Sequence, residues 1–177
     1  GHFAFGKNIR EDVLAPLRTS EGYVINSDGN YANIKLTERT WLISANLGKI
    51  FPLKKPNPNS GFLAMAGIGY MQHKINIYDV AKKVPQITGN YKKGYDRLSA
   101  GPMLHEFLGY IYFSNNRLVN FYGGFEFYQG FTKSLRTYNY DQMKSDNSLH
   151  IDLIYGFRIG WVLPVYKREE TSYLFND

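Results

Sequence analysis

One stretch in the second half of the chain limits its possible folds more than any other. Residues 119–132 read VNFYGGFEFYQGFT, in which Phe121, Phe125 and Phe127 alternate with polar, small or acidic residues such as Glu126. A β-strand points successive side chains to opposite faces, so this stretch predicts a strand with an aromatic wall and a polar wall. The two walls require two different environments.

The same alternation recurs along the rest of the chain. Because the apolar sets of the longer segments span about nine to eleven residues, each of these is long enough to cross a hydrocarbon layer as a tilted strand, whereas 2–6 is the end of one. Alternation over several segments indicates an all-β protein. Together with 119–132, the predicted strands are 2–6, 41–53, 61–78, 95–113 and 150–166.

The connections between these segments alternate in length. They are long after the first, third and fifth predicted strands and short after the second and fourth. Bacterial outer-membrane barrels show this asymmetry, with long extracellular loops and short periplasmic turns. The pattern therefore predicts an antiparallel up-and-down transmembrane β-barrel, a single domain over 1–168 with a short periplasmic tail at 169–177. Single-chain bacterial barrels have at least eight strands, so we expect a further hairpin, and a signal peptide, before Gly1.

The net charge and composition disfavour several classes of function. The net charge is +6, but Lys and Arg lie mostly in the connections, which disfavours nucleic-acid binding. Cysteine is absent, and no apolar run approaches the roughly 18 residues of a membrane helix. We expect the basic connections to face the head groups of outer-membrane lipid, including lipopolysaccharide. The lysines concerned are Lys74, Lys82, Lys83, Lys92 and Lys93.

Three ionisable residues are expected inside the barrel. A hairpin centred near Gln142 would place Glu126 opposite Arg158, with Asp152 on the same inward face. In a narrow barrel such groups form a structural ion-pair network. The four histidines show no metal-ligand spacing and no nucleophile motif is present, so neither a catalytic site, a metal site nor a cofactor is predicted.

The remaining candidates belong to the apolar wall. His105 and Glu106 should point to opposite faces, which puts Glu106 among apolar residues, where a charge is costly. We expect a β-bulge to turn it inward, the alternative being contact with a protein partner. Phe121, Phe125, Phe127 and Phe157 should face lipid or a partner. Aromatic anchors at the membrane interfaces are expected at Trp41, Tyr110, Tyr112, Trp161 and Tyr166.

Four motifs carry a resemblance to a known group of proteins. They are GIGYMQHKI (67–75), KKGYDRL (92–98), FYGGFEFYQGFT (121–132) and YGFRIGWVLPVYKR (155–168). With these, the chain resembles small outer-membrane β-barrel proteins of Bacteroidetes, of the OmpA transmembrane type. Only EETSYLFND follows Arg168, so the chain departs from OmpA in having no peptidoglycan-binding domain there. The resemblance implies an outer-membrane location, and some members serve as accessory subunits of secretion or barrel-assembly machines.

Three functional hypotheses remain at this point. The first is a non-enzymatic barrel that works with other outer-membrane proteins through its loops or its outer wall. The second is a barrel enzyme that modifies lipid A or phospholipid. The third is a soluble ligand-binding barrel of the lipocalin type, whose apolar faces would point inward.

Overall fold

The computed structural model describes residues 1–6, 12–53, 57–115 and 120–163. Its strands form one antiparallel sheet in the order β1-β2-β3-β4-β5-β6, in which each strand pairs with its neighbours in sequence. This is the up-and-down arrangement that the alternating segments predict. The elements are β1 (His2–Gly6), η1 (Ala15–Leu17), β2 (Ile34–Pro52), β3 (Gly61–Asp79), η2 (Pro85–Ile87), η3 (Tyr91–Gly94), β4 (Ser99–Phe113), β5 (Asn120–Ser134) and β6 (Leu149–Trp161).

The strands are long and their registers run without interruption. β2 and β3 are 19 residues each and pair along their whole length, from Ile34 opposite Asp79 to Pro52 opposite Gly61. The sequence predicts β2 only from Trp41, whereas the strand begins at Ile34 because Ile34 and Leu36 pack against the hydrophobic cluster of the loops. Tertiary packing therefore extends the hairpin beyond its alternating segment.

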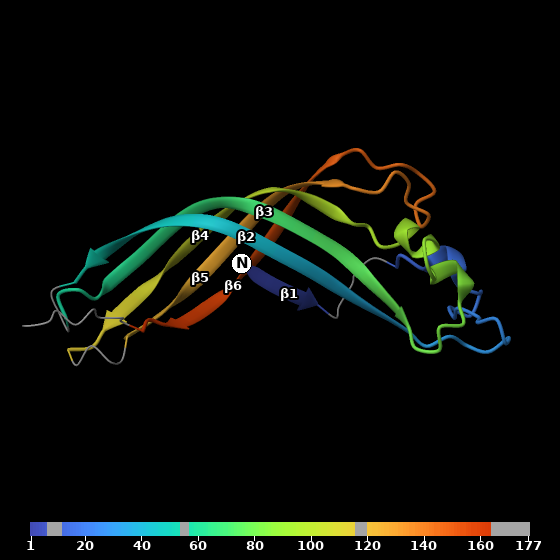
Figure 1. Cartoon of the computed structure of the whole chain (residues 1–177), viewed down its shortest axis with the longest axis horizontal. Coiled ribbons are helices and arrows are strands. Elements are labelled where there is room, and N and C mark those ends of the chain that lie inside the picture. Colours follow the sequence, from blue (N-terminus) through green and yellow to red (C-terminus); the bar gives the residue numbers. More distant parts are fainter. Residues whose placement is uncertain (7–11, 54–56, 116–119, 164–177) are drawn as a thin grey trace, which may run out of the picture.

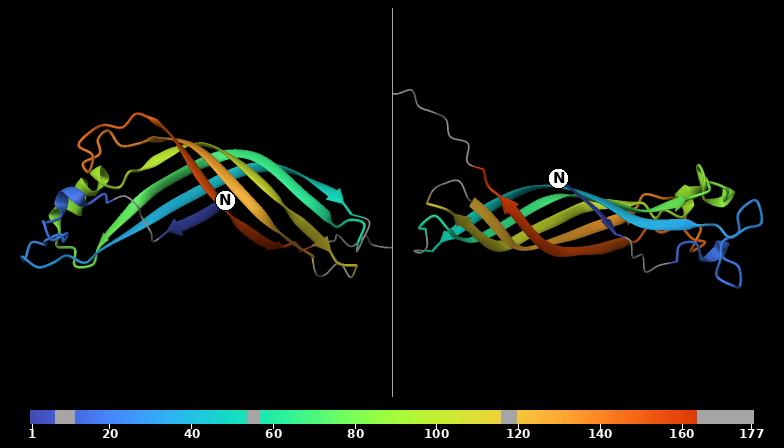
Figure 2. Two further views of the ribbon diagram at one scale, coloured as in Figure 1. Left: turned by 180° about the vertical axis from the view of Figure 1, so that it is seen from behind. Right: turned by 90° about the horizontal axis from the view of Figure 1, so that it is seen from below.

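The sheet is strongly curved and tilted (Figures 1 and 2). Neighbouring strands lie about 4.8 Å apart, so β1 and β5 would be about 19 Å apart in a flat sheet. Yet the His2 ring of β1 lies 6.0 Å from the Tyr128 ring of β5 and 6.5 Å from the His105 ring of β4. The face that carries these three rings is therefore the concave face.

The sheet does not close into a barrel. Within the described ranges, β1 pairs only with Glu38–Leu42 of β2, and the outer edge of β6 has no neighbouring strand. The part of the barrel prediction that the structure confirms is therefore an all-β, antiparallel, up-and-down six-stranded sheet. Among the described residues, no helix is long and apolar enough to span a membrane.

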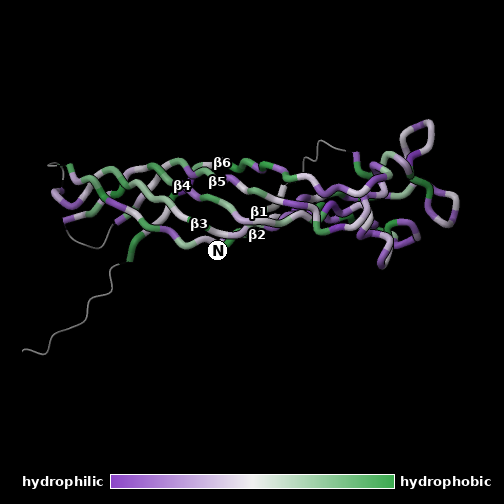
Figure 3. The backbone as a smooth tube through the Cα atoms, turned by 90° about the horizontal axis from the view of Figure 1, so that it is seen from above, coloured by the Kyte–Doolittle hydropathy of each residue, from purple (hydrophilic) through white to green (hydrophobic). Residues whose placement is uncertain are grey.

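The connections divide the molecule into two different ends, as their lengths predict. The long connections between β1 and β2, β3 and β4, and β5 and β6 gather at one end, and the short turns lie at the other (Figure 1). At the long-connection end, the backbone carries hydrophilic stretches interrupted by hydrophobic ones (Figure 3). A small hairpin is present there, since Ile25 pairs with Tyr31 and the Tyr23 and Tyr31 rings stack at 4.5 Å.

Candidate functional site

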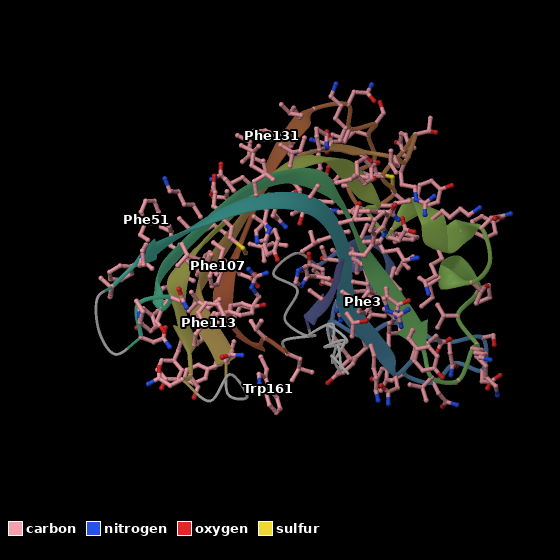
Figure 4. All side chains as sticks on the ribbon, turned by 60° about the vertical axis from the view of Figure 1, so that its left-hand side comes forward. Phe3, Phe51, Phe107, Phe113, Phe131 and Trp161 are labelled. Atoms are coloured by element: carbon pink, nitrogen blue, oxygen red, sulfur yellow. The ribbon has the colours of Figure 1, made fainter. Side chains whose placement is uncertain are left out.

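The convex face of the sheet is apolar and exposed. Phe125 is 62% exposed, Phe157 60% and Leu47 87%, although each lies within a long strand. The predicted outward residues Phe121 and Phe127 share this face. In Figure 4, Phe51 and Phe131 lie on the outside of the arch, while Phe107, which is fully buried, lies beneath it. An ordinary soluble sheet has the opposite arrangement, with its large apolar side chains buried.

Aromatic side chains border this convex face at two levels. At the loop end, Trp41 and Tyr70 pack with ring centroids 6.0 Å apart. From Trp41 to Phe51, β2 runs about 33 Å along the strand, or about 25 Å across at a tilt of about 40°. That height matches the apolar band of outer-membrane barrels, about 25 Å. At the short-turn end lie Phe62 with Tyr110, Tyr112 with Phe121, and Trp161 opposite Phe121, whereas Tyr166 lies outside the described residues.

The concave face holds the predicted ion pair, with a different register. Arg158 pairs with Gly124 and Glu126 with Gly156, so the two charged residues lie diagonally and not directly opposite each other. Arg158 Nε still lies 3.4 Å from Glu126 Oε2, and both side chains are only 16% exposed. The guanidinium also lies 4.5 Å from the centroid of the Phe107 ring and 5.5 Å from that of Tyr122. The cation is thus enclosed by a carboxylate and two aromatic faces.

His105 is the centre of this concave cluster. Its side chain is 1% exposed and stacks on Tyr128 at 4.3 Å between ring centroids. Asn46 Oδ1 lies 2.7 Å from His105 Nδ1, and Ser44 Oγ lies 3.3 Å from the same nitrogen. His105 Nε2 lies 3.7 Å from Glu126 Oε2. Among the described residues, His105 Nε2 and the Nε and Nη2 atoms of Arg158 lack an aligned hydrogen-bond partner.

Asp152 belongs to a second cluster on the same face. Its Oδ2 atom accepts a hydrogen bond from Thr132 Oγ1 at 2.5 Å and lies 3.1 Å from His73 Nε2. Asp152 has the same strand parity as Arg158, but it makes no contact with the Glu126–Arg158 pair among the described residues. Two polar clusters therefore lie along the strands on the concave face, which also holds the buried apolar residues Leu42, Met71 and Met103.

Ser44, His105 and Glu126 are the residues whose arrangement most resembles a catalytic one. A hydroxyl beside one imidazole nitrogen and a carboxylate beside the other is the order found in nucleophile, base and orienting acid. However, Asn46 holds His105 Nδ1 more closely than Ser44 does. In the part of the chain that the structure describes, no three His, Asp or Glu side chains come together to hold a metal ion.

Glu106 lies on the convex face, and the expected bulge is wrong. The register of β4 is constant with both β3 and β5, with Glu106 opposite Ala66 on one side and Phe127 on the other. Without an extra residue in β4 the alternation cannot shift, so His105 points inward and Glu106 outward. Gln129 Nε2 donates to the two carboxylate oxygens of Glu106 at 3.1 and 3.4 Å.

The long connections pack into a small core of their own at one end of the sheet. Two ion pairs lie beside this core. Arg136 donates to both oxygens of Asp96, at 2.7 and 2.5 Å, and this hydrogen bonding raises the pKa of Arg136. Arg97 donates through Nε to Asp141 at 3.0 Å. The core consists of Val13, Leu14, Val24, Ile77, Val84, Ile87 and Tyr95.

Burial at this end also changes the ionisation of single groups. Burial raises the pKa of the Tyr95 hydroxyl, and burial together with the charges of Lys74 and Arg39 lowers the pKa of Lys92. Asp146 accepts hydrogen bonds from the hydroxyl and backbone N–H of Ser148, which lower its pKa to about 2. The connections are therefore held by internal hydrogen bonds, ion pairs and a small hydrophobic core.

Sequence reasoning missed several of these residues. Ser44, Asn46 and Tyr128 share the inward parity of Glu126, and that shared parity is the signal by which they can be found. The pairs Arg136–Asp96 and Arg97–Asp141 join the connection after β3 to the connection after β5. Their residues are 40 and 44 positions apart in the chain. No pattern in the sequence identifies those partners.

Comparisons with known proteins gave no relative. A scan against protein-family models found no match, and neither a search of curated proteins nor a search of solved structures found one.

Proposed function

We propose that this protein is a non-enzymatic integral outer-membrane β-barrel that acts as an accessory subunit of a larger outer-membrane complex. The observation that carries the proposal is the inverted distribution of side chains. Large apolar residues such as Leu47 and Phe125 are exposed on the convex face, while Glu126, Arg158 and His105 are buried on the concave face. This distribution suits a barrel with lipid outside and polar groups inside. A lipocalin-type barrel would need the large apolar side chains on the concave face.

Closure of the barrel is part of the proposal. Lipid cannot satisfy the hydrogen-bonding groups of an open sheet edge, so both edges of this sheet must be paired in a membrane. Among the described residues, the edges without a neighbouring strand are the outer edge of β6, the outer edge of β1 and the parts of β2 that β1 does not cover. Two further strands between them would complete the eight strands of a small barrel. The long connections then face the exterior, and both ends of the described sheet domain lie on the periplasmic side.

The filled concave face favours a role through surfaces over a role as a pore. Met71, Phe107 and His105 are each at most 1% exposed, so side chains occupy the interior. Two surfaces remain for binding other molecules. One is the convex wall, which contacts lipid or another outer-membrane protein. The other is the loop end, whose lysines reach lipopolysaccharide head groups. From the resemblance to small outer-membrane barrels, we propose that the complex is a secretion or barrel-assembly machine.

Cell fractionation followed by purification in mild detergent tests this proposal. We expect the protein in the outer-membrane fraction and a co-purifying complex of defined composition. Recovery from the aqueous fraction without detergent would reject the membrane placement. A monomer without any crosslinked partner in intact cells would reject the role as a subunit.

A second candidate function has one supporting observation, the arrangement of Ser44, His105 and Glu126. We propose as the alternative that this cluster hydrolyses or transfers an acyl group of lipid A or phospholipid, with Ser44 as nucleophile. Lipid profiles of a deletion strain, complemented with the natural protein or with Ser44→Ala, test it. An unchanged profile in the deletion strain would remove the enzymatic alternative.

A further inference from the structure

Glu106 lies at the midpoint of β4, in the middle of the apolar convex face. Its neighbours on this face are Leu104 and Leu108 along the strand, Ala66 on β3 and Phe127 on β5. Gln129 is the one hydrogen-bond donor that Glu106 has among the described residues. Since a carboxylate offers about four acceptor positions, Gln129 leaves most of the hydrogen-bonding capacity of Glu106 unused among the described residues.

The position of Glu106 differs from that of Lys49, which also lies on this face. Lys49 is close to the end of β2 at Pro52, so its long side chain can reach the head-group level. Glu106 has a shorter side chain and lies half a strand length from either end of β4. At this depth a charged group facing lipid is costly, and such groups usually face protein or water.

The surface beside Glu106 is formed by small side chains. Ala66 lies directly opposite Glu106, and Ala64 lies opposite Leu108, so two small residues follow each other along this face of β3. Larger exposed side chains stand around them, among them Phe62, Ile68 and Leu47. Small residues in membrane proteins allow another backbone to approach closely, and polar side chains then form hydrogen bonds across the contact.

We propose that the Glu106 surface, defined as Ala64, Ala66, Glu106, Leu108 and Gln129, binds a transmembrane segment of another protein. That segment presents apolar side chains and one hydrogen-bond donor, preferably cationic, which contacts the free side of the Glu106 carboxylate. Charge complementarity selects this occupant over lipid tails, which offer no donor. The inference rests on the proposed function, because it requires the convex face to lie in the membrane.

Site-specific photocrosslinking in intact cells tests the inference. A benzophenone amino acid replaces Leu108 in one variant and Ile43 in a matched control, because these residues are similarly exposed, at 60% and 55%, on the same face. We expect a single protein adduct at 108, mapped by mass spectrometry to a membrane segment with a donor side chain, and lipid adducts at 43. Adding Glu106→Leu should lower the protein adduct at 108 about three- to ten-fold, since hydrogen bonds in membranes contribute modestly to association.

Each outcome decides the inference. Lipid adducts at both positions, with the protein still in the outer membrane, would reject the Glu106 surface and leave the proposed function intact. A protein adduct at 108 that Glu106→Leu does not reduce, or whose mapped segment has no donor, would also reject it. Recovery of the protein in the aqueous fraction would reject the proposed function and this inference together. Glu106→Gln, which keeps the side-chain shape, should retain more of the adduct than Glu106→Leu.

Discussion

Two carboxylates on neighbouring strands show how differently the two faces of this sheet treat the same chemical group. Glu106 lies opposite Phe127, and Glu126 lies opposite Phe107, so the two acids are adjacent in the sheet but on opposite sides of it. Glu126 has a guanidinium, a hydroxyl and an imidazole around it, while Glu106 has a single amide. The concave face surrounds its carboxylate with several hydrogen-bonding and charged groups, whereas the convex face offers its carboxylate one amide.

Removing the counter-charge on the concave face should have the largest effect. Arg158→Met leaves the Glu126 carboxylate buried without its cation, and breaking a buried pair in this way costs about 3–5 kcal/mol. We expect that loss in the free energy of unfolding, measured by urea titration of protein folded in phosphatidylcholine vesicles. The double variant Glu126→Gln/Arg158→Met removes both charges and should recover most of it. If Arg158→Met lowers the free energy of unfolding by less than about 1 kcal/mol, the Glu126–Arg158 pair is not desolvated.

Two glycines of β6 probe how closely the concave face is packed. A Cβ atom at Gly160 would lie 2.4 Å from the Tyr122 ring, whereas one at Gly156 would meet nothing within 4 Å. Gly160→Ala must displace an aromatic ring and should lower the free energy of unfolding by about 1–3 kcal/mol. Gly156→Ala is the matched control on the same strand and face, and it should change stability little. Equal effects of the two variants would contradict the arrangement of Tyr122.

On the convex face, removing the carboxylate should stabilise the isolated protein. In vesicles without a partner, the proposed membrane placement puts Glu106 against lipid, so Glu106→Leu should raise the free energy of unfolding by about 1–2 kcal/mol. Lys49→Leu, nearer the membrane surface, should change it by about 1 kcal/mol or less. An unchanged or lower stability for Glu106→Leu would mean that this part of the face does not contact lipid. The same variant is expected to weaken the partner contact, so stability and function would respond in opposite directions.

We expect the smallest effect on stability at Asp146, a carboxylate in the connection between β5 and β6. It serves as the comparison for the two carboxylates of the sheet. Its pKa is lowered from 3.8 to about 2, so its stabilising contribution is complete above pH 4 and is lost as the pH falls toward 2. Pepsin cleavage within 135–148 should therefore accelerate between pH 4 and pH 2 relative to Asp146→Asn. The same cleavage profile in both proteins would show that the Ser148 hydrogen bonds do not hold this loop.

The two faces also differ in how far the sequence predicts them. Alternation in residues 119–132 is sufficient to place Phe125 and Phe127 on one face and Glu126 on the other, because side-chain direction in a strand has a period of two. The same rule places Glu106 and His105 on opposite faces. The expectation of a bulge was wrong because it gave the cost of an exposed carboxylate more weight than the unbroken alternation of β4.

The contacts within the concave face are harder to predict. Parity identifies Ser44, Asn46 and His105 as inward residues, but only the curvature of the sheet brings His2 against Tyr128. The register between β5 and β6 is offset from the expected hairpin centre, which makes the Glu126–Arg158 contact diagonal. The ion pairs of the loops depend on how separate connections pack against one another. Local sequence does not encode any of these distances.

The strand order has a consequence for how the protein reaches its final form. Every strand pairs with the strand before or after it in the chain, so each hairpin is complete once its second strand has emerged. Contacts between sequence neighbours keep the loop-closure entropy low, which favours rapid pairing. The sheet can therefore grow one hairpin at a time, with β6 adding last to an edge that β5 already presents. The edge of β6 that remains after that step offers its unpaired backbone groups to any further strand that comes to lie beside it.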